Sequence, residues 1–256
     1  MNNWAVILGA SSGIGRECAI ELAKNKINIF GIYLRKPKEY IQELEDEIKS
    51  YGVNVIYKKM NAANESNRLE AMKELQSIKN INVKVFIHSL AFGTLKPMID
   101  KDPTNQLKQK QIEMTTDVMS HSLIYWTQDL FNNKLLNENS QIISMTSAGG
   151  NKQWKNYGAV SLAKSSLESA TRQLALELAP FKIACNAIEA GVTITAALEK
   201  IPGFQSMIDR TLKLNPHKRL TLPIDIANAV VMLCLHNTSW ITGNTIKVDG
   251  GETLTN

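Results

Sequence analysis

Hydrophobic residues gather in seven short runs along the chain, and polar residues dominate the longer stretches between them. The runs are rich in β-branched side chains and nearly uninterrupted, as strands buried on both faces of a parallel sheet require. They are Trp4–Leu8, Ile27–Ile32, Val53–Lys58, Val83–His88, Gln141–Met145, Ile183–Ile188 and Thr245–Val248. The stretches Lys38–Tyr51, Asn64–Ser77 and Leu162–Ala179 have the length and polarity of surface helices. This alternation predicts an α/β fold, a doubly wound parallel sheet of about seven strands with helices on both faces.

No Pro-, Gly- or Ser-rich linker interrupts the alternation, so residues 1–256 are predicted to form a single domain. Two stretches, Ala91–Lys110 and Gly191–Leu222, are too long and irregular for simple connections. Each follows a predicted strand and therefore leaves the carboxyl edge of the sheet, where open α/β sheets bind ligands. We expect a substrate-binding lid around 192–222, with Phe204, Met207 and Ile208 among its apolar side chains.

A glycine-rich turn follows the first predicted strand and precedes a predicted helix. Glycines let the chain turn tightly and approach a pyrophosphate, while the helix start supplies unpaired N–H groups. The spacing is Gly-x-x-x-Gly-x-Gly, and its position makes a Rossmann-type dinucleotide site the preferred interpretation over an empty turn. The candidate cofactor-binding residues here are Gly9, Ser11, Ser12, Gly13, Ile14 and Gly15.

The segment after the second predicted strand indicates which dinucleotide binds. NAD-specific sites place an acidic residue there to bind the ribose hydroxyls. Here the chain has Arg35, Lys36 and Lys38 and no acid, so a 2′-phosphate would meet cations. We therefore expect NADP(H), with Arg35 as the contact, although exposed loops also carry such residues.

Composition narrows the remaining classes. The net charge is +5, with 21% charged and 44% hydrophobic residues, and no concentrated basic stripe predicts nucleic-acid binding. No apolar run approaches the ~20 residues that span a bilayer, and the start of the chain does not resemble a signal peptide. Cys18, Cys185 and Cys234 have no metal-ligand spacing, so no metal is expected. A cytoplasmic protein with reduced thiols is expected.

The glycine turn, together with Asn156-Tyr157 and Lys164, resembles the short-chain dehydrogenase/reductase family along the whole chain. Ordinary members carry Tyr-x-x-x-Lys, but Val160 stands where that tyrosine would be, and Tyr157 lies seven residues before Lys164. This Tyr-x6-Lys spacing resembles the enoyl-acyl carrier protein reductases, a divergent branch. So do His88-Ser89-Leu90-Ala91 in place of Asn-Asn-Ala-Gly and Met119 in place of the catalytic Asn. Ser147 is more similar to the type III enzymes of that branch.

The resemblance implies an NADPH-dependent reduction of the carbon–carbon double bond of an enoyl thioester, which an acyl carrier protein presents. It implies that Tyr157 stabilises the enolate oxygen and that Lys164 binds the nicotinamide ribose. It implies cofactor contacts for Asn61, Ser89 and Thr195, although Thr195 also suits a helix N-cap. His88 is a candidate for either a cofactor contact or a buried core histidine. A homodimer or homotetramer is implied as well, and small residues of the long helix (Ser165, Ser166, Ser169, Ala170) would admit a neighbouring helix.

The Tyr157–Lys164 spacing also has a physical meaning. Residues seven apart on a helix differ by about 20° in direction, so both side chains are expected on one face. A nearby ammonium is expected to lower the phenol pKa and improve it as a donor. The lid cations Arg210, Lys213, Lys218 and Arg219 are candidates for docking an acidic carrier protein.

Two other functions remain open. One is a carbonyl (3-oxoacyl-type) reductase in which Tyr157 protonates an alkoxide, against which Met119 and Val160 count. The other is a non-catalytic NADP(H)-binding protein, which would have no need of a phenol and an ammonium together. Ser144 and Ser147 are not assigned between substrate contacts and strand-end hydrogen bonds.

Overall fold

All seven predicted strands pair in parallel into one sheet, in the order β3-β2-β1-β4-β5-β6-β7. The computed structural model describes residues 2–236 and 238–254. The strands are β1 Asn2–Leu8, β2 Asn28–Tyr33, β3 Val55–Lys59, β4 Ile81–His88, β5 Gln141–Ser147, β6 Ala184–Ala190 and β7 Thr245–Val248. The chain reverses direction across the sheet between β3 and β4, which places a topological switch point between β1 and β4. The predicted doubly wound α/β fold is confirmed.

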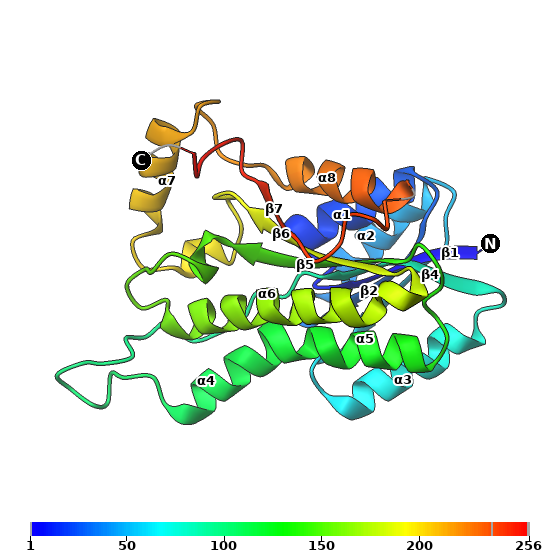
Figure 1. Ribbon diagram of the computed structural model, residues 1–256, viewed down its shortest axis with the longest axis horizontal. Helices are drawn as coiled ribbons and strands as arrows, with labels where there is room; N and C mark the ends of the chain where they lie inside the picture. Colours follow the sequence, from blue (N-terminus) through cyan, green and yellow to red (C-terminus); the bar gives the residue numbers. More distant parts are fainter. Residues whose placement is uncertain (1, 237, 255–256) are drawn as a thin grey trace.

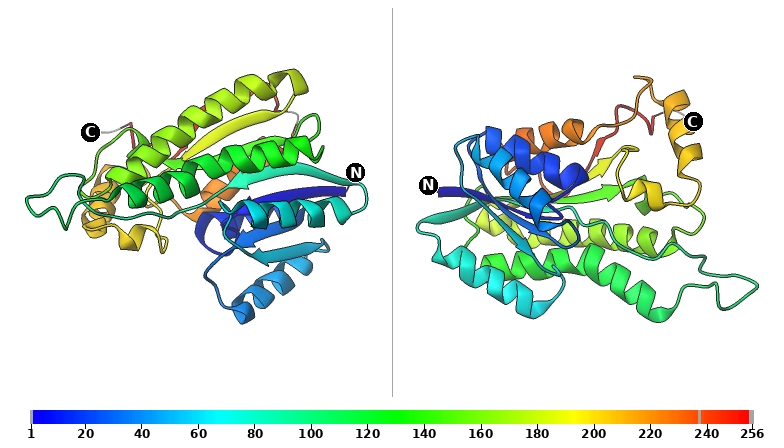
Figure 2. Two further views of the ribbon diagram at one scale, coloured as in Figure 1. Left: turned by 90° about the horizontal axis from the view of Figure 1, so that it is seen from below. Right: turned by 180° about the vertical axis from the view of Figure 1, so that it is seen from behind.

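The helices cover both faces of this sheet (Figure 1, Figure 2). They are α1 Gly13–Lys24, α2 Lys38–Lys49, α3 Glu65–Ser77, α4 Gln109–Thr116, α5 Ser122–Asn132, α6 Gly158–Leu178, α7 Phe204–Leu214 and α8 Pro223–Leu235. On one face lie α1, α2 and α8, and on the other α3, α5 and α6. The long predicted helix begins at Gly158 rather than Leu162, one residue after Tyr157.

Two apolar cores lie on opposite sides of the sheet, because alternate side chains of each strand point to opposite faces. From β1, Ala5 and Ile7 pack toward α1 and α8. Trp4, Val6 and Leu8 pack toward α3, α5 and α6. All five are at most 2% exposed, which explains why this strand reads as an uninterrupted apolar run.

A π-helical turn, Asp117–His121, joins α4 to α5 and lies against α6. The Ser120 hydroxyl donates to the Ser166 hydroxyl over 2.9 Å. The small residues of α6 therefore admit a helical segment of the same chain at Ser166, and Ser165 is likewise engaged, donating to the Gly150 carbonyl over 2.7 Å.

The two irregular stretches both lie at the carboxyl edge of the sheet. The segment after β4 forms an arm that projects beyond the sheet before α4 begins (Figure 1), and the backbone N–H of Leu107 donates to the Pro97 carbonyl over 2.9 Å. The segment after β6 carries α7, which stands across the same edge. Among the described residues, no helix is both long enough and apolar enough to span a bilayer.

Candidate active site

The glycine turn after β1 is packed so closely that side chains are excluded from it. A Cβ on Gly9, whose φ is +83°, would lie 2.2 Å from the Ser89 carbonyl oxygen, and one on Gly15 would lie 2.3 Å from the Gly9 oxygen. The turn is tied to β2 by the backbone N–H groups of Gly9 and Ala10, which both donate to the Ile32 carbonyl. This arrangement leaves the first turn of α1 free to present its N–H groups to an anion.

The other predicted residues of the turn differ in their exposure. Ser12 is the exposed N-cap of α1, and its hydroxyl makes no capping hydrogen bond. Ser11 is buried at 8% exposure. Ile14 is half-buried, and its side chain packs on the core next to α1, which leaves its backbone as the candidate contact. These residues fit a dinucleotide phosphate, because only backbone and small hydroxyl groups line the turn.

Ser89 and Thr195 come to this turn from elsewhere in the chain. Ser89 follows β4, and its backbone N–H donates to the Leu8 carbonyl over 3.0 Å. The Thr195 methyl carbon would lie 3.3 Å from a Cβ on Gly13, and its hydroxyl accepts from the Leu198 N–H over 3.2 Å. Thr195 thus lies beside the glycine turn, while its hydroxyl also accepts from the first residue of the short 3₁₀ turn Leu198–Lys200, whose N-cap is Ala197.

The cations after β2 lie over aromatic rings. Arg35 is exposed, with its guanidinium carbon 5.7 Å from the centre of the Phe92 ring. Lys36 lies 4.6 Å from the centre of the Tyr40 ring. In the described part of the chain no carboxylate pairs with Arg35, whereas Arg16 is bound to Glu47 over 2.7 Å. Arg35 is therefore available to an added phosphate.

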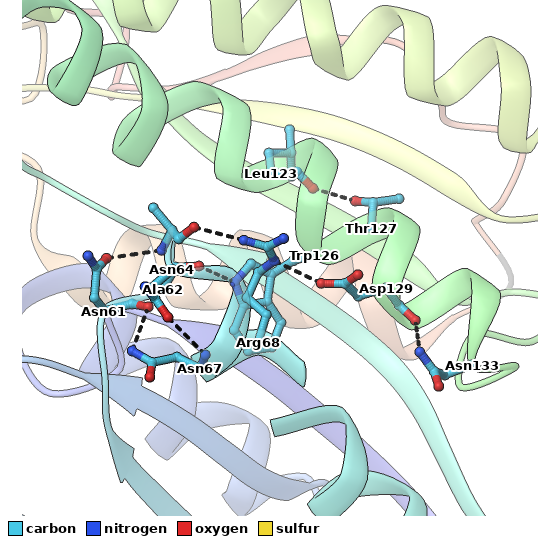
Figure 3. A network of polar contacts seen from close by, with 11 residues as sticks. Asn61, Ala62, Asn64, Asn67, Arg68, Leu123, Trp126, Thr127, Asp129 and Asn133 are labelled. Atoms are coloured by element: carbon cyan, nitrogen blue, oxygen red, sulfur yellow. Dashed lines mark hydrogen bonds and ion pairs between the residues drawn. The ribbon is translucent and has the colours of Figure 1, made fainter. Parts of the chain in front are cut away.

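Asn61 lies in the turn after β3, and a network that sequence reasoning missed holds this turn in place (Figure 3). Its side-chain oxygen accepts from the Ala63 N–H over 3.0 Å. Arg68 donates to the Ala63 carbonyl over 2.7 Å and pairs with Asp129 of α5 over 2.8 Å. The Trp126 indole N–H donates to the Ala62 carbonyl over 2.8 Å. No local sequence pattern predicts these contacts, because Arg68 and Asp129 are far apart in sequence.

Tyr157 occupies the N-cap position of α6, and its carbonyl accepts from the Ser161 N–H over 2.8 Å. Its ring lies against Gly149, where a Cβ would be 2.4 Å from the Tyr157 Cε1 atom. Burial raises the pKa of the Tyr157 phenol, and the adjacent Ser147 hydroxyl opposes this shift. The expectation that an ammonium lowers this pKa is wrong, because burial dominates and the Lys164 amine is directed elsewhere.

Lys164 is buried at 8% exposure, and its Nζ donates to the Met145 carbonyl over 2.5 Å. Burial lowers its pKa to about 8, and the Glu168 carboxylate opposes this shift. His88 lies on β4 at 1% exposure and shares a 2.8 Å hydrogen bond with Ser122. Burial and the charge of Lys164 lower the pKa of His88 to about 3, so the imidazole is neutral at physiological pH. His88 is thus a buried histidine with one ring nitrogen bonded to Ser122, whereas its Nδ1 atom has no hydrogen-bond partner among the described residues.

The two positions where ordinary family members carry catalytic residues are apolar and packed together. Met119 lies in the π-helical turn at 2% exposure and Val160 lies on α6 at 6%. They form a cluster with Ala163, against which Tyr157 and Phe92 pack. This cluster gives one side of the tyrosine an apolar wall in place of an amide.

The two serines left unassigned by the sequence separate clearly. Ser144 is fully buried and its hydroxyl shares a 2.9 Å hydrogen bond with Thr171, so it belongs to the interior. The buried Ser147 hydroxyl makes no geometrically sound hydrogen bond within the described residues, although it lies beside the Tyr157 phenol. Of the two serines, Ser147 is therefore the one whose hydroxyl has no hydrogen-bond partner among the described residues.

The predicted lid contains one clear helix, α7, with Phe204, Met207, Ile208 and Leu214 half-buried along it. The Trp154 indole N–H donates to the Pro202 carbonyl over 3.4 Å, which connects the segment before α7 to the loop that carries Tyr157. Among the predicted docking cations, Arg219 is already bound to Asp225 over 2.6 Å. Arg210, Lys213 and Lys218 are exposed.

The cysteines lie in the interior of the protein. Cys18, Cys185 and Cys234 are free and buried. In residues 2–236 and 238–254, no group of three or more His, Cys, Asp or Glu side chains is arranged to hold a metal ion.

A profile of the family described as "Enoyl-(Acyl carrier protein) reductase" matches residues 9–253 of the chain. The enoyl-[acyl-carrier-protein] reductase [NADH] FabI of Haemophilus influenzae is 31% identical over 170 residues, 66% of this chain and 64% of that protein. The corresponding [NADPH] protein of Staphylococcus aureus is 28% identical over 170 residues, 66% of this chain and 65% of that protein. These matches thus span slightly less than two thirds of the relatives' length.

Two further likenesses extend over nearly the whole chain. The 3-oxoacyl-[acyl-carrier-protein] reductase FabG of Staphylococcus epidermidis is 29% identical over 255 residues, covering 98% of this chain and 99% of that protein. The crystal structure of an enoyl-[acyl-carrier-protein] reductase (NADH) from Aquifex aeolicus has a TM-score of 0.84 at 24% identity, covering 99% of this chain and 97% of that one. The latter supports the fold alone.

Proposed function

Because the chain belongs to the enoyl-(acyl carrier protein) reductase family of short-chain dehydrogenases/reductases, we propose that it reduces the carbon–carbon double bond of an enoyl thioester with NADPH. The observation that carries this proposal is the placement of Tyr157. Its phenol stands at the start of α6, seven residues before the buried Lys164, and the usual tyrosine position is filled by Val160.

A bound nicotinamide would supply the hydride for the β-carbon of the substrate. Negative charge then develops on the thioester oxygen, and the Tyr157 hydroxyl donates a hydrogen bond to that oxygen. Its raised pKa keeps the phenol protonated at neutral pH, so the donor is always present. Lys164 binds the nicotinamide ribose through its buried ammonium, and the Met119–Val160 wall excludes water from this side of the ring.

The cofactor preference rests on Arg35, since relatives of both the NADH and the NADPH type match the chain. Arg35→Ala should raise the KM for NADPH by about 10- to 100-fold, the usual range for a lost hydrogen bond to a charged group. The KM for NADH should hardly change. Lys73→Ala, which removes an exposed cation of α3 outside this segment, is the matched control. Equal effects of Arg35→Ala on both cofactors would remove the basis for NADP(H).

The FabG likeness over 98% of the chain favours a second candidate, reduction of a 3-oxoacyl thioester. Purified protein is mixed with NADPH and crotonyl or longer enoyl thioesters, then with the matching 3-oxoacyl thioesters, and absorbance is followed. Oxidation with the enoyl substrate alone supports the proposal. Oxidation with the ketone alone supports the second candidate, and saturable NADPH binding without turnover of either indicates a non-catalytic binding protein.

The lid and its cations suggest how the substrate is delivered. The half-buried apolar side chains of α7 would cover the acyl chain, and the exposed Arg210, Lys213 and Lys218 would meet an acidic carrier protein. Replacing these three cations by Glu should reduce turnover of carrier-bound substrate and spare free thioesters. Unchanged turnover of the carrier-bound substrate would contradict docking at this surface.

The cellular location and assembly belong to the same proposal. We place the protein in the cytoplasm, where acyl carrier proteins deliver such substrates, as a homodimer or homotetramer. Leu162 of α6 is 47% exposed and Leu176 is 70% exposed, which leaves apolar area on this helix for a second copy. Light scattering on the purified protein would distinguish these assemblies from a monomer.

A further inference from the structure

A row of polar contacts fastens α6 to the carboxyl end of β5. Along the helix, Thr171 meets the Ser144 hydroxyl over 2.9 Å, and Glu168 accepts from the Thr146 hydroxyl over 2.6 Å. Lys164 follows one turn earlier, with its bond to the Met145 carbonyl. Three successive turns of α6 thus hold consecutive residues of the strand that leads to Ser147.

Glu168 is the unusual member of this row, because it is an acidic side chain with only 6% exposure. A buried carboxylate is costly unless it is paired and hydrogen-bonded. Its hydrogen bond comes from Thr146, and the charge nearest in the helical register is Lys164, one turn earlier on the same face. Gly150 also lies against it, since a Cβ there would be 2.5 Å from the Glu168 Oε1 atom.

We propose that Glu168 is a positioning residue, whose carboxylate serves as the buried counter-ion that keeps Lys164 protonated and holds the β5–α6 loop beneath Tyr157. The role in catalysis rests on the proposed function, because it acts through the ammonium that binds the cofactor ribose. Within the described residues, Glu168 makes no hydrogen bond to Tyr157 or to the glycine turn; its bond is to Thr146.

The charges around the pair all bear on this role. Lys164 faces Glu168 on its own helix and His88 on β4. Of these two groups, Glu168 is the one whose charge stabilises the protonated form of Lys164. Glu168 in turn faces Glu189 of β6, which is also a buried acid. Burial raises the pKa of Glu189, and the charge of Lys247 on β7 opposes this shift. His88, with a pKa lowered to about 3, does not titrate at neutral pH. A change of charge near pH 8 therefore belongs to Lys164.

The test is Glu168→Gln, which preserves the shape of the side chain and an acceptor for Thr146 but removes the charge. NADPH binding is measured by cofactor fluorescence between pH 6 and pH 10. The wild-type affinity should fall with a midpoint near pH 8, where Lys164 loses its proton. In Glu168→Gln the midpoint should move down by about one unit or more, as loss of a nearby opposite charge implies. Glu177→Gln, an exposed acid further along α6, should leave it in place.

A Glu168→Gln profile that superimposes on the wild-type one would overturn the proposal, as would a wild-type profile without a midpoint in this range. Circular dichroism checks that the variant folds. If it does not, Glu168→Met, which removes the charge and fills a similar volume, must move the midpoint downward, and a fixed midpoint overturns the proposal. The measurement of NADPH binding needs no thioester. Failure to reduce enoyl substrates would therefore contradict the proposed function without changing the result for Glu168.

Discussion

The acidity of the Tyr157 phenol is set by its surroundings rather than by the neighbouring amine. Its ring is packed against Gly149 and the Met119–Val160 cluster, and burial disfavours the phenolate. A phenol that stays neutral is a poor acid but a permanent hydrogen-bond donor. That property suits stabilisation of an enolate oxygen better than complete proton transfer.

Tyr157→Phe should therefore lower kcat for enoyl thioester reduction by about 10²- to 10³-fold, the usual cost of one lost oxyanion donor. NADPH affinity should remain within twofold, because the missing hydroxyl leaves Lys164 and the glycine turn intact. Steady-state kinetics and a fluorescence titration measure the two quantities. Reduction at the wild-type rate would show that another group, of which Ser147 is the nearest, performs this task.

The pH dependence separates the two titrating groups of the site. Lys164 has a pKa lowered to about 8, so its charge is fully present below pH 7 and is lost as the pH rises through 8. Burial raises the pKa of Tyr157, so its ionisation lies well above that of Lys164. We expect kcat/KM to be flat from pH 6 to 7 and to fall about tenfold per unit above pH 8. A kcat/KM that stays flat through pH 8 and falls only in more alkaline solution would assign the fall to the phenol instead.

At the scale of elements, the strands could be predicted because a strand buried on both faces requires an uninterrupted apolar run in the sequence. The run Trp4–Leu8 lies inside β1, and Val83–His88 inside β4. The glycine turn could be placed for a similar reason, since Gly9 and Gly15 occupy positions where any Cβ would collide with backbone.

The remaining parts depend on contacts between distant residues. The early start of α6 at Gly158 follows a loop that the sequence alone does not distinguish from a helix boundary. The π-helical turn at Met119 depends on its packing against α6, and the Arg68–Asp129 pair joins two helices. The seven-residue spacing between Tyr157 and Lys164 is visible in the sequence. The effect of burial on the pKa of each side chain depends on the packed structure.

The π-helical turn provides a test of the apolar wall. Met119→Asn would restore the side chain of ordinary family members, but it would place an amide in a cluster of Val160, Ala163 and Phe92. An unsatisfied buried amide should destabilise the protein by about 1–3 kcal/mol and should not create ketone reduction. Met119→Leu, with a similar volume, should cost less than about 1.5 kcal/mol. Denaturant unfolding and the 3-oxoacyl assay measure both effects, and a stable, ketone-reducing Asn variant would contradict this view of the wall.

At the scale of the whole molecule, the proposed dinucleotide site joins segments from both halves of the chain. The glycine turn comes from the β1–α1 connection, Ser89 follows β4 and Thr195 follows β6. A ligand held by all three stabilises the folded protein as a unit, by about 2.7 kcal/mol at a concentration 100 times its Kd. NADPH should therefore raise the Tm by several degrees, and NADH at equal concentration should raise it less.

Gly15→Ala should abolish this rise, because its Cβ would lie 2.3 Å from the Gly9 oxygen and distort the turn. Gly52→Ala supplies the matched control. Gly52 has a φ of +76° in an exposed turn, so alanine there strains the backbone without any close contact. It should lower the Tm by itself yet keep the full NADPH-dependent rise in a thermal melt. If Gly15→Ala retained the rise, the cofactor would bind away from the glycine turn, and Tyr157 and Lys164 would lose the partner against which their roles are defined.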